Sequence, residues 1–301
     1  YYTLNNILME SIKVKNNINL LNYTTIKVDG YTEFFVEPNS ISELIEYLKW
    51  VKLNNLNYRI IGAGSNLLIK NTLHKGLTIC TRKLKKLNIN HISGLVEAEC
   101  GVMLPVMANQ LALNGCDGGE WLIGIPGTIG GAVFMNAGAG KLWISKYLVS
   151  IEVLDTSNLS IYKLKKENLI FKYRFSSFQT NKLAILSASF LFRPDKNIKK
   201  IIDKTKENLK LKTKTQPYHL PSFGSVFKNP TNNYAGQLIE EAGLKGFSIG
   251  GAQVSRMHSN FIVNNGSATS EDIYQLITLI QQKVLQKKGI FLHPEVRMIG
   301  Y

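Results

Sequence analysis

The sequence predicts an α+β protein with more than one domain. A strand–helix–strand pattern runs from about residue 31 to 70, and short strands alternate with glycine-rich passages from about 77 to 193. A charged helical stretch then leads into a further α/β module. The 301 residues are enough for two or three domains with well-buried cores.

The first α/β unit begins with YTEFFVEP, which predicts a strand closed by Pro38. Ser40 and Glu43 have the spacing of a capping box and predict the start of a helix. Apolar residues then recur at helical spacing and predict one buried face: Ile41, Leu44, Ile45, Leu48 and Val51. YRII, residues 58–61, predicts a buried strand that leads into GAGSN, residues 62–66.

In the middle segment, LVEAECGV and SIEVLD predict strands, and GIPGTIGGAVFMNAGAG occupies its centre at residues 124–140. The charged stretch RPDKNIKKIIDKTKENLKLKTKTQP predicts a helix that connects two domains, so we place a boundary near residue 195. The last hundred residues predict a helix ended by Gly243, a strand at HSNFIVN and a helix capped by Thr269 and Asp272 and closed by Gly289. HPEVRMIG predicts the final strand.

The net charge of +15 is compatible with nucleic acid, an anionic membrane surface or acidic small ligands. The lysines are spread through KLKKLN, KLKKEN, KNIKK and KLKTKTK, and no ribonucleoprotein or finger motif accompanies them. A solvated basic surface is therefore favoured over a nucleic-acid site. No apolar run approaches the roughly 18 residues of a membrane helix, and the first thirty residues lack a secretory pattern, so we expect a cytoplasmic protein without membrane insertion.

Three cysteines without C-x-x-C spacing predict reduced, mostly buried thiols rather than a disulfide framework or a zinc site. The five histidines form no metal-ligand pattern, so we expect no metal.

Two glycine-rich passages suggest anion sites. GAGSN lacks the third glycine of the dinucleotide fingerprint, because Leu67 occupies that position and LLI continues as a strand. It can form a tight turn that makes an anion-binding nest, but this passage taken alone favours a plain strand-to-strand turn. The second passage is denser and suggests a backbone that a ligand approaches closely; its glycines are Gly124, Gly127, Gly130, Gly131, Gly138 and Gly140. Two such passages suit a long diphosphate ligand.

PSFGSVFKNP raises the question of what Ser225 does. The nucleophile elbow of hydrolases is absent, because Phe227 stands where its second glycine belongs.

Six motifs in order carry a family resemblance over residues 22–300: GAGSNLL, GIPGTIGGAVFMNAGA, KYRFSSF, GSVFKNP, HSNFIVNNG and HPEVR. They closely resemble the UDP-N-acetylenolpyruvoylglucosamine reductases of bacterial peptidoglycan synthesis, in the compact subtype without a long tyrosine-bearing loop. The resemblance implies a non-Rossmann FAD-binding fold of the vanillyl-alcohol-oxidase type in residues 1–75 and 76–195, and a substrate-binding domain in residues 196–301. It also implies that NADPH reduces a non-covalent FAD, and that the flavin reduces the enolpyruvyl ether of UDP-N-acetylglucosamine to a lactyl ether.

The resemblance places the catalytic residues at Arg174, Ser225 and Glu295. It places FAD contacts in the two glycine-rich passages: Gly62, Ala63, Gly64, Ser65, Asn66, Gly124, Pro126, Gly127, Thr128, Gly130, Gly131, Asn136 and Gly138. Candidate substrate contacts are Tyr173, Lys214, Gln216, Lys228, Asn229 and His258. The chain departs from the family pattern at Ala63, where a third glycine is frequent, and at Gly140, where an aromatic residue is frequent.

The chemistry needs these three side chains. Hydride addition to the terminal alkene carbon leaves charge on an enediolate, which preorganised donors stabilise. Arg174 supplies a charged fork to the carboxylate, Glu295 helps if it is protonated, and Ser225 gives its proton to the carbanion-like centre. Without the resemblance, ordinary structural roles are the favoured explanation of all three: a surface salt-bridge partner for Arg174, a strand-edge charge for Glu295 and a turn residue for Ser225.

Two other functions remain open at this point. A flavin oxidase of the same fold would need a histidine or cysteine for covalent attachment, and His74 lies near the first glycine passage in an unsuitable context. A basic nucleic-acid-binding module would be colourless and would bind duplex in a salt-dependent way. We expect a monomer whose partner is the small-molecule substrate.

Overall fold

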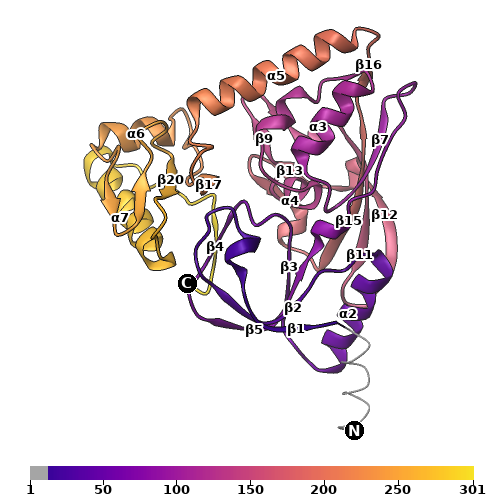
Figure 1. The fold of residues 1–301 in the computed structure, drawn as a ribbon, viewed down its shortest axis with the longest axis horizontal. Helices are drawn as coiled ribbons and strands as arrows, with labels where there is room; N and C mark the ends of the chain where they lie inside the picture. The colour runs from indigo at the N-terminus through magenta and orange to yellow at the C-terminus, as the bar shows by residue number, and fades with distance from the viewer. Residues whose placement is uncertain (1–12) are drawn as a thin grey trace. The chain divides into compact units, whose positions relative to one another are not determined.

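The computed structural model describes residues 13–301 and divides the chain into two compact units (Figure 1). Unit 1 contains the described residues up to Ile18, together with Thr32–Ala63 and Lys75–Leu209. Unit 2 contains Asn19–Tyr31, Gly64–His74 and Lys210–Tyr301. Each unit is thus assembled from segments far apart in the sequence. The three-part division expected from the sequence stays a prediction.

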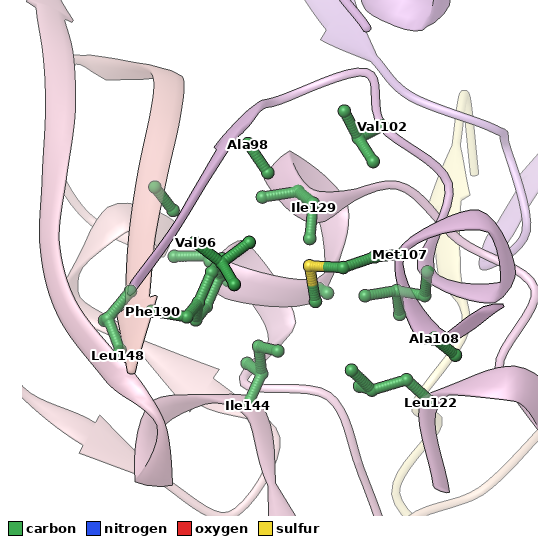
Figure 2. Close-up of a cluster of buried hydrophobic side chains, with 14 of the residues drawn as sticks. Val96, Ala98, Val102, Met107, Ala108, Leu122, Ile129, Ile144, Leu148 and Phe190 are labelled. Atoms are coloured by element: carbon green, nitrogen blue, oxygen red, sulfur yellow. The ribbon is translucent and has the colours of Figure 1, made fainter. Parts of the chain in front are cut away.

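Unit 1 contains a five-stranded antiparallel sheet with the order β12-β11-β15-β7-β6. Its strands are β6 (Leu87–Ile89), β7 (Leu95–Glu99), β11 (Leu148–Asp155), β12 (Ile161–Lys165) and β15 (Leu183–Leu191). The helices α3 (Leu104–Leu113) and α4 (Ile129–Met135) pack on its apolar face. Figure 2 shows Val96 and Phe190 of the sheet meeting Met107 of α3 and Ile129 of α4 in this cluster. Burial of each such side chain contributes about 1.5–3 kcal/mol.

A second sheet has the order β1-β2-β5-β3. Its strands are β1 (Lys15–Asn19), β2 (Tyr31–Val36), β3 (Tyr58–Ile61) and β5 (Leu73–Cys80), and β3 pairs with β5 in parallel. The helix α2 (Ile41–Leu53) places Leu44 and Leu48 against Leu77 and Ile79 of β5. Leu44 and Leu48 of the predicted apolar face are therefore confirmed as buried.

The cap of α2 differs from the predicted capping box. The Ser40 side chain accepts a hydrogen bond from the Glu43 N–H, as expected, at 3.1 Å. The Glu43 carboxylate instead accepts from the backbone N–H of Asn39 at 2.9 Å, one residue earlier than a capping box requires. A carboxylate at this end still compensates the unpaired N–H groups of the first turn.

Short elements complete unit 1. The paired strands are β8 (Cys116–Asp117) with β16 (Arg193–Pro194), β9 (Gly138–Ala139) with β10 (Leu142–Trp143), and β13 (Phe171–Lys172) with β14 (Phe175–Ser176). The 3₁₀ helices are η2 (Thr81–Lys83), η3 (Glu120–Gly124), η4 (Ile144–Lys146), η5 (Lys166–Asn168) and η6 (Ser177–Gln179).

The charged segment predicted to connect domains forms the helix α5 (Ile198–Thr215). The boundary between the two compact units falls within it, after Leu209. In unit 1, Lys204 on this helix lies 3.2 Å from a carboxylate oxygen of Glu120, whose side chain is only 3% exposed. Lys204 also lies 3.6 Å from a carboxylate oxygen of Asp117. The ion pairs of this one lysine therefore link the first half of α5 to η3 and β8.

Unit 2 contains a four-stranded sheet with the order β17-β20-β19-β18. Its strands are β17 (Ser222–Ser225), β18 (Ser248–Ile249), β19 (Ala252–Val254) and β20 (Phe261–Asn264). The helices α6 (Ala235–Glu241) and α7 (Ser270–Lys288) lie beside this sheet and share its apolar core (Figure 1). Unit 2 also holds η1 (Leu20–Tyr23) and the parallel pair β4 (Leu67–Ile69) and β21 (Arg297–Ile299).

The ends of α7 match the sequence prediction. Thr269 and Asp272 form a complete capping box, and Gly289 ends the helix with a φ of +67°. The final strand is shorter than HPEVRMIG suggested, because β21 begins at Arg297. Pro294 has no N–H to give to a ladder and makes only an isolated bridge to Phe227.

No helix among residues 13–301 is long and apolar enough to cross a membrane. Over the same residues, no group of three or more histidine, cysteine, aspartate or glutamate side chains is arranged to hold a metal ion.

Candidate active site

The first glycine passage connects β3 to β4, so a strand follows it and not a helix. The prediction that it is not a Rossmann turn is therefore confirmed. A Cβ added at Gly62 would lie 2.2 Å from the hydroxyl oxygen of Thr128. The start of the first glycine passage thus lies directly against the second one, which the sequence did not indicate.

In the second passage, Thr128 caps α4, because its hydroxyl accepts a hydrogen bond from the Gly131 N–H. Gly130 packs on the protein itself: its N–H donates to the Cys100 carbonyl at 2.8 Å, and an added Cβ would lie 3.0 Å from the Cys100 Cβ. An added Cβ at Gly131 would meet only the Thr128 hydroxyl, at 3.6 Å. Protein packing therefore explains Gly130, whereas Gly131 keeps an open backbone that a ligand can approach.

Two buried cysteines, Cys80 and Cys100, contact the backbone of these passages. The Cys80 thiol donates to the Gly62 carbonyl at 3.7 Å, and Cys100 contacts Gly130 as described. Burial raises the pKa of Cys80, and burial raises the pKa of Cys100 to about 12. All three cysteines are free and buried, which confirms the prediction of reduced thiols. These thiols are neutral packing groups at physiological pH.

The segment beside Gly64 has unused hydrogen-bonding groups. A Cβ at Gly64, whose φ is +63°, would lie 2.0 Å from the Tyr23 carbonyl oxygen. The buried hydroxyls of the next two residues, Thr24 and Thr25, have no hydrogen-bond partner within the described chain. Buried hydroxyls are normally paired, so an oxygen-rich ligand such as the predicted diphosphate fits here.

Arg174 occupies the tip of the hairpin formed by β13 and β14. It is half-buried and has a φ of +53°, a strained conformation for an arginine and of a kind that concentrates at functional sites. Its guanidinium donates to the Gly138 carbonyl at 3.3 Å and lies 5.0 Å from the centre of the Tyr173 ring.

Neighbouring polar groups hold this hairpin in place. The Asn136 side chain donates to the Lys172 carbonyl at 2.9 Å, and Gln179 donates to the Arg174 carbonyl at 3.3 Å. Ser176 donates to the Phe134 carbonyl of α4 at 2.7 Å. Asn136 and Gly138, expected to contact FAD, therefore support the arginine. Gln179 and Ser176 were not singled out in the sequence, although both lie in or beside the KYRFSSF motif.

Ser225 and Glu295 come together in unit 2. Ser225 ends β17 and pairs with Phe261, after an irregularity at Gly224, where φ is +77°. The Glu295 N–H donates to the carbonyl of Val226 at 2.7 Å, so the two residues lie on adjacent backbone segments. Both are half-buried, and no hydrogen bond occupies the Ser225 hydroxyl within residues 13–301. Arg174 belongs to unit 1.

The candidate substrate contacts differ in their surroundings. Within unit 2, Lys214 is exposed at the end of α5, whereas Gln216 and Lys228 are half-buried. The Asn229 side chain accepts from the Ala235 N–H at 3.0 Å and so supports α6. His258 Nδ1 accepts from the Asn260 N–H at 3.2 Å, and burial lowers its pKa. In unit 1, Tyr173 is 54% exposed.

Other predicted FAD contacts in the two passages are buried or hydrogen-bonded within the protein. Gly124 is buried at the end of η3, the Gly127 carbonyl accepts from the Leu104 N–H at 2.8 Å, and Ala63 is buried. Ser65 and Pro126 complete the predicted set, and their role stays a prediction. His74, considered for covalent flavin attachment, hydrogen-bonds through Nε2 to the Lys70 carbonyl at 3.0 Å.

Comparisons with known proteins identify the family of the chain. A family model described as the C-terminal domain of UDP-N-acetylenolpyruvoylglucosamine reductase matches residues 216–299, and an FAD-binding domain model matches residues 32–161. The reductase of that name from Prochlorococcus marinus subsp. pastoris is 61% identical, covering 97% of this chain and 99% of the relative. A Synechococcus reductase of the same name is 45% identical over 98% of this chain and 96% of its own length.

Among solved structures, the crystal structure of UDP-N-acetylenolpyruvylglucosamine reductase from Thermus caldophilus matches with a TM-score of 0.78. It is 29% identical, and the match covers 95% of this chain and 98% of that one. Together with the FAD-binding domain model, it confirms the predicted α+β fold class of the vanillyl-alcohol-oxidase type.

Proposed function

Because the chain belongs to the UDP-N-acetylenolpyruvoylglucosamine reductases, FAD oxidoreductases of peptidoglycan synthesis, we propose how its own residues carry out the reduction. The observation that supports the proposal best is the direct backbone link between the segments of Ser225 and Glu295. A hydroxyl and a carboxyl on adjacent segments are the two proton-bearing groups that an enediolate requires.

Bound FAD, reduced by NADPH, supplies the hydride for the terminal alkene carbon. In unit 2, the Gly64–Asn66 part of the first glycine passage and the buried hydroxyls of Thr24 and Thr25 fit the cofactor. In the proposed arrangement these groups hold its diphosphate through backbone and hydroxyl donors. In unit 1, the open side of the Gly131 backbone leaves room for the cofactor to approach.

Arg174 binds the substrate carboxylate in this proposal. Its hairpin is held by Gln179, Ser176 and Asn136, so the guanidinium is presented from a fixed backbone and loses little freedom when it binds. A planar guanidinium matches a carboxylate with two parallel hydrogen bonds and keeps its charge at all physiological pH values. It thereby stabilises the negative charge that spreads onto the carboxylate.

Ser225 donates the proton to the carbon next to the carboxylate, and protonated Glu295 donates a hydrogen bond to the developing charge. The hydroxyl is suited to this task because no hydrogen bond within the described chain competes for it. Substrate contacts from Lys214, Gln216, Lys228, Asn229, His258 and Tyr173 are part of the same proposal, as are a cytoplasmic location and a monomeric state.

The variant Ser225→Ala tests the proton-donor role. We expect reduction of FAD by NADPH to stay within about twofold of wild type, and reoxidation by the enolpyruvyl substrate to slow by at least about 10³-fold, within the range expected when a positioned proton donor is lost. Stopped-flow absorbance of the flavin, without oxygen, measures both half-reactions separately.

The matched control is Ser222→Ala, which removes a half-buried hydroxyl from the same strand. It should leave both half-reactions unchanged. Near-normal reoxidation of the Ser225→Ala variant would refute the proton-donor role. A protein that never acquires flavin absorption with added FAD would refute the cofactor assignment itself.

A further inference from the structure

Asn66, the last residue of the first glycine passage, holds the backbone on which Glu295 lies. Its side-chain Nδ2 donates to the Glu295 carbonyl at 3.0 Å. Its own carbonyl accepts from the Arg297 N–H at 2.9 Å. Directly afterwards β4 and β21 begin, with Leu67 opposite Arg297 in parallel pairing. The side-chain amide of Asn66 thus takes the place of a backbone N–H donor. It extends the hydrogen bonding between the two segments to Glu295, which precedes β21.

The Glu295 backbone is fixed on its other side by the serine segment. Its N–H donates to the Val226 carbonyl, and the Val226 N–H donates to the Asn260 carbonyl at 2.8 Å. The buried Asn260 side chain accepts from the Phe227 N–H at 3.0 Å and donates to the Phe227 carbonyl at 2.9 Å. Glu295 therefore lies between a rigid strand that carries Ser225 and the single amide of Asn66.

We propose that Asn66 is a positioning residue for Glu295. A carboxyl leaves the backbone in a direction set by the peptide groups on both sides of its Cα, and Asn66 fixes one of these groups. The Asn66 side chain donates to the Glu295 carbonyl itself, so it fixes the peptide group that follows the Glu295 Cα. The inference rests on the proposed role of Glu295 and assigns Asn66 to the substrate step, beyond the FAD contact that the sequence suggested.

The expected effect is on the rate of the substrate step. A displacement of about 1 Å in a catalytic group costs on the order of 10²-fold in rate. For Asn66→Ala we therefore expect reoxidation by the enolpyruvyl substrate to slow by about 10–100-fold. Reduction by NADPH should stay within about twofold, and the concentration of substrate for half-maximal reoxidation should change little. The longer amide of Asn66→Gln should recover part of the rate, because it keeps the donor.

The matched control is Gln281→Ala, which removes a side-chain amide that donates to the Leu292 carbonyl at 2.9 Å, only three residues before Glu295. This variant should leave both half-reactions unchanged. It thereby shows that losing a side-chain hydrogen bond to the segment before Glu295 does not by itself slow the reaction. Thermal unfolding and titration of the apoprotein with FAD, followed by flavin fluorescence, accompany each variant. If Asn66→Ala does not fold, Asn66→Ser, which keeps a hydroxyl donor, replaces it in the same measurements.

A double-mutant cycle with Glu295→Ala, which removes the hydrogen-bond donor, distinguishes the possible outcomes. If Asn66 acts through Glu295, its substitution slows reoxidation in the wild-type background and has little further effect in the Glu295→Ala background. Equal slowing in both backgrounds would overturn the positioning role and leave the proposed function intact. A loss confined to FAD affinity or NADPH reduction would overturn it as well. Normal reoxidation by Glu295→Ala alone would instead refute the proposed role of Glu295, and the positioning role with it.

Discussion

Two neighbouring glycines of α4 should respond in opposite ways to the same substitution. In Gly130→Ala, the new methyl meets the Cys100 Cβ at 3.0 Å and its carbonyl oxygen at 3.3 Å, so the apoprotein should lose about 1–3 kcal/mol through overpacking. In Gly131→Ala, the methyl meets only the Thr128 hydroxyl at 3.6 Å. Alanine in a helix is favoured over glycine by about 0.5–1 kcal/mol, so this apoprotein should be slightly more stable.

The binding of FAD should separate from stability in Gly131→Ala. If the cofactor approaches this backbone, the methyl removes a contact of the charge-assisted kind, worth about 1.5–3 kcal/mol, which corresponds to roughly 10–150-fold in affinity. Fluorescence titration of the apoprotein with FAD measures the affinity, and urea unfolding of the apoprotein measures the stability. Unchanged FAD affinity in the more stable Gly131→Ala protein would refute the reasoning that a ligand, and not packing, requires this glycine.

Two other predictions concern stability. Because burial raises the pKa of the Cys100 thiol from 9.0 to about 12, the folded protein keeps a proton that the unfolded chain releases. The resulting stabilisation is complete below pH 9 and is lost as the pH rises towards 12. The free energy of unfolding in urea should therefore fall by up to about 1.4 kcal/mol per pH unit more in the wild type than in Cys100→Ala. Parallel pH profiles of the two proteins would contradict this. Lys204→Ala leaves the carboxylate of Glu120, which is 3% exposed, without its cation and should lower the free energy of unfolding by about 1–3 kcal/mol. Adding Glu120→Gln to the same chain should restore most of this loss. An unchanged urea midpoint in Lys204→Ala would show that the ion pair is unimportant.

Local features of the fold followed directly from the sequence. The helices α2, α5 and α7 were predicted because apolar or charged residues recur at helical spacing and because Ser40, Thr269 and Gly289 mark their ends. Such signals act within a few residues of the chain. Where a neighbour competes for the same group, as Asn39 does for Glu43, the local prediction changes in detail.

The site was predictable to a different degree. The motifs predicted Arg174, Ser225 and Glu295 as catalytic residues, and their roles stay a prediction. The structure places Arg174 on a hairpin of unit 1, and Ser225 and Glu295 on adjacent segments of unit 2. The motifs gave no reason to connect Asn136 with the arginine hairpin or Asn66 with Glu295, since these contacts join segments 36 and 229 residues apart. Both asparagines were expected at the flavin because they belong to glycine-rich passages.

The sequence by itself determined the helices α2, α5 and α7, both ends of α7, the two glycine-rich passages and the family, because each depends on residue type and short-range spacing. Tertiary structure alone decided that Gly62 lies against Thr128, that Gly131 is open while Gly130 is packed, and that unit 2 gathers three separate segments of the chain. Those outcomes depend on long-range packing of apolar faces and on the pairing of backbone groups across distant segments. Neither is encoded in the local pattern of any one motif.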